Sequence, residues 1–80
     1  MNLNQRKKEI LRMVSIYLID NTIPFKYSGN VINVEKYFKL TTYSNSEVEI
    51  ITTNYNKDFK FLSEVSDAFI LDVIDKIIYN

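Results

Sequence analysis

The spacing of apolar residues changes twice along this chain, and that change constrains the fold more than any other feature. Residues 3–20 and 62–77 place apolar side chains three and four positions apart, which is the period of a helix with one buried face. Residues 23–53 instead alternate apolar and polar side chains, which is typical of half-buried strands. The 80 residues contain one Gly and one Pro, so we expect no linker and a single domain over residues 1–80.

The N-terminal helix is predicted over residues 3–20 and is apolar on two sides. The first apolar side is formed by Leu3, Ile10, Val14, Tyr17 and Leu18. The second is formed by Met13, Ile16 and Ile19. Such a helix is either covered on both sides or offers one side to a partner, and a small chain has little material for two coverings. We therefore expect self-association or partner binding, including a homodimer, through Met13, Ile16 and Ile19.

The middle of the chain predicts an antiparallel meander. Pro24 lacks an amide N–H, so the alternating residues around it suit an edge strand. The turn that follows contains the only glycine, Gly29. Residues 31–43 suit either two short strands or one long strand with a bulge. The expected class is α+β, in the order α-β-β-β-α with a fourth short strand left open, and with both helices packed on one face of the sheet.

The C-terminal stretch, residues 58–80, has the densest apolar content and predicts a second helix. Its buried face is expected to contain Leu62, Val65, Phe69, Val73 and Ile77, widened by Ile70 and Ile74. Ser63 or Asp58 would cap its start. Residues 58–61 alternate, so a short strand leading into the helix is the alternative.

Two apolar residues of this helix, Leu71 and Ile78, fall outside the predicted buried face. They lie seven positions apart, so they share one line of the helix, and Glu64, Asp67 and Asp75 flank them. Apolar side chains in an acidic frame suit a protein-binding site. The alternative is that a sheet or another helix covers them.

Composition excludes several kinds of chemistry. The chain has no Cys and no His, which removes thiol nucleophiles, thiolate metal sites and the commonest general base. A single Gly cannot form a glycine-rich phosphate loop. The remaining acid pairs have a spacing that is common on solvated helix faces. We expect no enzymatic activity, no metal and no cofactor.

The charges are balanced overall but unevenly placed, which bears on nucleic-acid binding. Residues 1–40 carry seven basic and three acidic side chains, and residues 41–80 carry three and seven. The basic candidates are Arg6, Lys7 and Lys8 in the first helical turns, and Lys36, Tyr37 and Lys39 on the predicted sheet. The element order is similar to that of a double-stranded RNA-binding domain, but that family has a basic last helix where this chain has Glu64 and Asp67. Nucleic-acid binding is therefore the second hypothesis.

The first hypothesis is a protein-binding module that acts through Glu64, Asp67, Leu71, Asp75 and Ile78. The residues Ile, Lys, Asn, Tyr and Phe, which have A/T-rich codons, are frequent, whereas Ala and Gly occur once each. This usage favours a low-GC bacterium or its phage. Small acidic phage inhibitors are similar in size and charge placement, so an inhibitor or adaptor is expected. The longest apolar run is too short for a membrane span, and we expect a cytoplasmic protein without membrane association.

Overall fold

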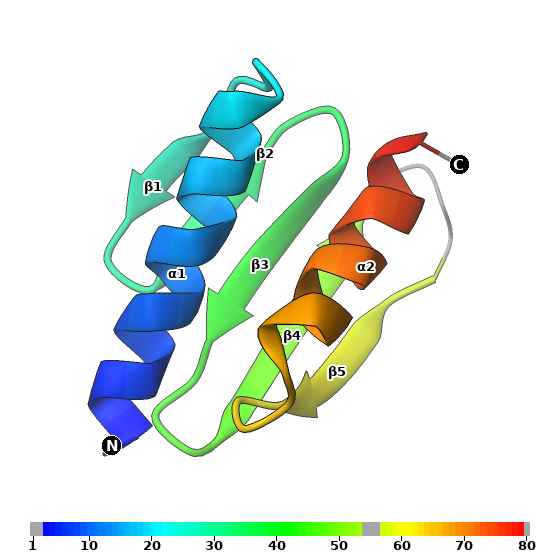
Figure 1. Ribbon diagram of the computed structural model, residues 1–80. Helices are drawn as coiled ribbons and strands as arrows, with labels where there is room; N and C mark the ends of the chain where they lie inside the picture. Colours follow the sequence, from blue (N-terminus) through cyan, green and yellow to red (C-terminus); the bar gives the residue numbers. More distant parts are fainter. Residues whose placement is uncertain (1–2, 54–56, 80) are drawn as a thin grey trace.

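The computed structural model describes residues 3–53 and 57–79. They form two helices and five strands (Figure 1). The elements, in chain order, are α1 (Leu3–Asp20), β1 (Lys26–Ser28), β2 (Val31–Val34), β3 (Phe38–Thr42), β4 (Glu47–Thr52), β5 (Phe59–Leu62) and α2 (Asp67–Tyr79). The predicted α+β class is confirmed, and the sheet has one strand more than the four that were considered.

The sheet is an antiparallel meander in which each strand pairs with the next along the chain. Ser28 pairs with Val31, so the β1–β2 hairpin turns through two residues. Gly29 has a positive φ of 60° there, which a residue without a side chain adopts at little cost. Residues 31–43 form two strands rather than one, because the chain turns after Val34 and Tyr37 donates its N–H to the Val34 carbonyl.

Both helices cover the same face of the sheet and run parallel to each other, α1 over its β1 side and α2 over its β5 side (Figure 1). The strands point their buried residues towards these helices: Ile32, Val34, Phe38, Leu40, Val48 and Ile50. The helices contribute Ile10, Leu11, Val14, Leu18, Ile70, Val73, Ile74 and Ile77. The opposite face of the sheet carries polar and charged residues such as Asn33, Lys39 and Lys60, which are exposed. No helix within the described ranges is long and apolar enough to cross a membrane.

The start of the second helix differs from the prediction. Leu62 belongs to β5 and Val65 to the connection after it, because residues 59–62 pair with β4 and so adopt the strand alternative. Ser66 caps the helix, with its Oγ accepting a hydrogen bond from the Phe69 N–H at 3.1 Å, so the predicted caps Ser63 and Asp58 are wrong. Phe69 was expected in the core but is 46% exposed, because the buried face of α2 is centred on Ile70, Val73, Ile74 and Ile77 and leaves Phe69 at its edge, beside Phe61 of β5.

Candidate functional site

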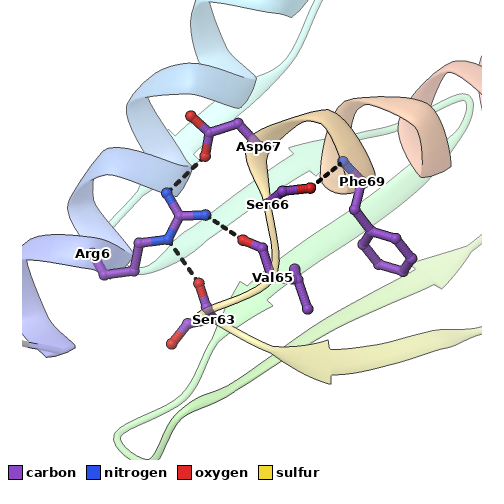
Figure 2. A network of polar contacts seen from close by, with 6 residues as sticks. All are labelled: Arg6, Ser63, Val65, Ser66, Asp67 and Phe69. Carbon is purple, nitrogen blue, oxygen red and sulfur yellow. Dashed lines mark hydrogen bonds and ion pairs between the residues drawn. The ribbon is translucent and has the colours of Figure 1, made fainter.

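Arg6 joins α1 to the connection between β5 and α2 (Figure 2). Its guanidinium donates from Nε to the Ser63 carbonyl, from Nη2 to the Val65 carbonyl and from Nη1 to Asp67 Oδ1, each at 2.7 Å. The Arg6 side chain is 18% exposed, whereas Asp67 is 61% exposed. Planar guanidinium geometry suits several acceptors at once. Arg6 therefore fixes where α2 begins relative to α1.

Two further hydrogen bonds connect α2 to α1 and to the residue that directly follows α1. The Tyr17 hydroxyl donates to Asp75 Oδ1 at 2.8 Å, and the Tyr79 hydroxyl donates to Asn21 Oδ1 at 3.0 Å. Burial of the Tyr17 hydroxyl, followed by its bond to the Asp75 carboxylate, raises its pKa to about 12. With Arg6 at one end and Tyr79 at the other, the two helices are held side by side from start to end.

An open groove of about 430 Å³ lies between the two helices. Its lining is mostly apolar and comes from both helices: Glu9, Arg12, Met13, Ile16, Tyr17 and Asp20 of α1, and Asp67 and Leu71 of α2. The groove thus brings together residues from two sites that were predicted separately. Met13 and Ile16 belong to the predicted self-association set, and Asp67 and Leu71 to the predicted partner-binding set.

The remaining members of those two sets lie outside the groove. Ile19 is 62% exposed and is not part of the lining. Glu64 is exposed in the turn before α2 rather than on the helix. Asp75 lies beside the groove, bonded to the lining residue Tyr17. Ile78 is partly buried and packs against the core, which is the covered alternative that was considered for it.

The groove combines exposed or partly buried apolar side chains with charged ones. Ile16 is 47% exposed, and Met13 and Leu71 are partly buried. Three carboxylates line the groove, from Glu9, Asp20 and Asp67, against one guanidinium, from Arg12. Asp67 is paired with Arg6, so Glu9 and Asp20 provide most of the acidic character of the groove.

The basic residues considered for nucleic acid do not gather on one surface. Arg6 is hydrogen-bonded within the fold, and Lys7 is buried at 8% exposure. Lys8 is exposed on α1, whereas Lys39 is exposed on the open face of the sheet. Lys36 lies in the turn between β2 and β3, and Tyr37 packs partly against the core.

The open sheet face balances its own charges. Lys60 lies 4.0 Å from carboxylate oxygens of both Glu47 and Glu49. The Tyr43 hydroxyl donates to Glu49, and this bond raises the Tyr43 pKa. Tyr43 and Lys60 therefore interact with the acidic residues of β4.

Sequence reasoning missed the α1 side of the groove at Glu9, Arg12, Tyr17 and Asp20. Their contribution depends on the parallel placement of two helices that are far apart in the sequence, and no local pattern encodes it. Arg6 gave one signal, because a basic residue in the first turn opposes the helix dipole. That signal was considered as the mark of a basic patch, but the contacts of Arg6 lie within the fold.

Comparison with protein families, curated proteins and solved structures found no significant match. Among the residues that the structure describes, no group of three or more acidic side chains is placed to hold a metal ion.

Proposed function

We propose that this chain is a non-enzymatic protein-binding module, acting as an adaptor or inhibitor, whose contact surface is the groove between α1 and α2. The observation that carries this proposal is the convergence of Met13, Ile16 and Leu71 in one groove with acidic residues around it. Exposed apolar side chains gathered in a concave patch with a polar rim are typical of protein-binding surfaces.

The partner's chemistry follows from the lining. An open groove with an apolar floor accepts a protruding apolar or aromatic side chain, which is the usual anchor of a small interface. Glu9 and Asp20 favour a partner with lysine or arginine beside that anchor. The partner is thus a protein with an apolar anchor in a basic surface, such as one that itself binds nucleic acid.

Two matched variants test this proposal. Ile16→Glu places a charge in the groove, and Ile51→Glu places the same charge on the open sheet face at a similar exposure, 47% against 42%. Tagged wild type and both variants would capture partners from a nuclease-treated lysate of a low-GC bacterium, with quantification by mass spectrometry. We expect Ile16→Glu to lower recovery of the partner at least about tenfold, equivalent to about 1.4 kcal/mol, and Ile51→Glu to leave it unchanged.

Charge reversal distinguishes the contribution of the charged residues at the rim of the groove, such as Glu9, from that of its apolar floor, formed by Met13, Ile16 and Leu71. Glu9→Lys should weaken capture most at low salt, because charges at a rim act through screened electrostatics. Asp67 and Asp75 are unsuitable for this purpose since both are bonded to α1. Equal recovery by Ile16→Glu and Ile51→Glu would contradict the proposal, as would partners that are lost whenever nuclease is added.

A further inference from the structure

The two edges of the sheet are protected to different degrees. At one edge, β1 has three residues and follows Pro24, and short strands with a nearby proline resist pairing with other chains. At the other edge, β5 has four residues, Phe-Lys-Phe-Leu, and no neighbouring proline. The β5 edge is therefore the one where a further strand can add.

The backbone of β5 has hydrogen-bonding groups directed away from the sheet. Ser63 donates its N–H to the Ser46 carbonyl at 2.7 Å, which fixes the alternation of the β4–β5 ladder. In an antiparallel pair, alternate residues point their backbone groups to opposite sides. By this alternation Phe59 and Phe61 bond to β4, whereas the N–H groups of Lys60 and Leu62 and the Lys60 carbonyl face outward.

Apolar side chains are exposed on both sides of this edge. On the helical side, the rings of Phe61 and Phe69 meet edge to face with centroids 5.6 Å apart, and Phe69 is 46% exposed. Figure 2 shows the Phe69 ring projecting from α2 away from Arg6. On the open side of the sheet, Leu62 is 46% exposed. The edge thus offers apolar contact above and below a strand with unpaired backbone groups.

We propose that a second copy of this chain pairs with β5, strand against antiparallel strand, with Lys60 of each copy opposite Leu62 of the other. In this register the Leu62 N–H of each copy donates to the Lys60 carbonyl of the other, and the Lys60 N–H donates to the second lone pair of the Leu62 carbonyl, which also accepts the Val65 N–H of its own chain at 3.2 Å. It places the two Phe61 rings directly opposite each other at a non-hydrogen-bonded position, where side chains approach closely and aromatic pairs are favourable.

This register is favoured over the two adjacent ones, which would be centred on Lys60 or on Leu62. Centring the pair on Lys60 would place the two Lys60 ammonium groups opposite each other, and like charges in direct opposition are destabilising. Centring it on Leu62 would extend the pairing beyond the end of β5. In the proposed register each Lys60 lies between Glu49 of its own chain and an apolar residue of the second copy, so no like charges oppose one another.

The pairing has a consequence for the groove between the helices. The two-fold axis of an antiparallel strand pair is perpendicular to the sheet, so both helical layers would lie on the same side of one continuous sheet. Two grooves would then face in the same direction. One four-residue strand per copy buries less than about 1,000 Å², so the dimer is expected to be weak and concentration-dependent.

Substitution at Lys60 tests the pairing without disturbing β4. Lys60→Pro removes an outward N–H and leaves the β4–β5 ladder intact, while Lys60→Ala removes the same side chain but keeps the N–H. Sedimentation velocity from low micromolar to near-millimolar concentration would compare both with the wild type, after circular dichroism has established that each is folded. We expect dimer formation by the wild type and Lys60→Ala, and an association constant lowered at least about tenfold in Lys60→Pro.

A second variant is needed because Lys60→Pro could weaken the dimer by disturbing the fold of the single chain. Phe69→Lys changes a half-exposed residue of α2 and should also weaken the dimer by placing two ammonium groups near each other. A wild type that stays monomeric throughout would overturn the proposal. So would a dimer that is retained by Lys60→Pro and Phe69→Lys but lost in Ile16→Glu, since that result places self-association on α1.

Discussion

At the scale of single residues, Arg6 is the side chain that makes the most hydrogen bonds between distant segments of the described chain. It supplies donors to two carbonyls in the connection before α2, one of them from the buried residue Ser63. Its ion pair with the exposed Asp67 adds little, because exposed pairs are screened by water. The loss of a charged donor from partly buried carbonyls, in contrast, leaves acceptors that water reaches poorly.

Arg6→Ala is therefore expected to lower the free energy of unfolding by about 2 kcal/mol. Arg6→Lys should recover less than half of this loss, because an ammonium group does not match three acceptors spread around a planar fork. Urea unfolding monitored by circular dichroism measures both values. Arg12→Ala, on the exposed side of the same helix, is the control and should cost little. A similar loss in the Arg6 and Arg12 variants would refute the role given to Arg6.

Tyr17 predicts a pH dependence whose sign follows from its pKa. The pKa is about 12 in the folded chain and 10.0 for an unperturbed tyrosine, so between these values the unfolded chain has lost a proton that the folded chain keeps. The contribution of Tyr17 to stability is therefore complete below the unfolded pKa and is lost as the pH rises towards the folded one. In Tyr17→Phe, stability should fall less steeply across this window. Urea unfolding below and within the window, with Tyr27→Phe as the control, measures the difference.

At the scale of elements, the end of α1 contains a residue that its backbone conformation does not favour. The Thr22 N–H bonds to the Ile19 carbonyl and the Ile23 N–H to the Leu18 carbonyl, which is the hydrogen-bonding pattern of a Schellman motif. Thr22 occupies the left-handed position of this motif with a φ of 55°. A β-branched side chain is strained there, and glycine is the usual residue.

Thr22→Gly should therefore stabilise the chain, by about 0.5–1 kcal/mol, although glycine in most positions destabilises. Thr22→Ala removes the hydroxyl and the branching but keeps a side chain at positive φ, so it should gain less than glycine. Thermal unfolding of the wild type, Thr22→Gly and Thr22→Ala ranks the three proteins by stability. A lower midpoint for Thr22→Gly than for the wild type would show that the strain is compensated by contacts of the threonine.

The elements themselves could be predicted to different extents from the sequence. The extent of α1, the Gly29 turn and the alternation of β3 followed from local periodicity and turn chemistry, because each depends on neighbouring residues. The start of α2 could not be predicted in this way. Leu62 and Val65 fit the period of the helix, but Phe59–Leu62 fits the alternation of a strand equally well. Pairing with β4 decides between the two, and that contact is not local.

The groove itself was not predicted, and only some of its residues were singled out, for the same physical reason. Met13, Ile16 and Leu71 were recognised as apolar residues without a place in the predicted core, and the structure places all three in the groove. That they line one groove depends on the parallel packing of α1 against α2. The hydrogen bonds that fix this packing join residues 58 and 61 positions apart, as in Tyr17–Asp75 and Arg6–Asp67.

At the scale of the whole molecule, the fold mixes charges that the sequence separates. The basic first half and the acidic second half would give opposed ends if the chain were extended. Instead α1, with Arg6 and Arg12, lies beside α2, with Asp67 and Asp75, and two of these residues form an ion pair. Interspersed charges and a net charge of zero do not favour binding to the phosphate backbone, which is attracted by continuous basic surfaces.

The folded protein is therefore expected not to bind nucleic acid in a saturable way. Fluorescence anisotropy of a labelled single strand and a labelled duplex, at low and at physiological salt, measures this directly. Binding that is saturable, falls steeply with salt and is lost in Lys39→Ala would contradict the expectation and assign function to the open sheet face. Loss in Lys8→Ala instead would assign it to the exposed start of α1. If neither oligonucleotide binds while a protein partner is captured through Ile16, the groove between α1 and α2 is the contact surface, and the basic residues, which are dispersed over the molecule, do not form a second one.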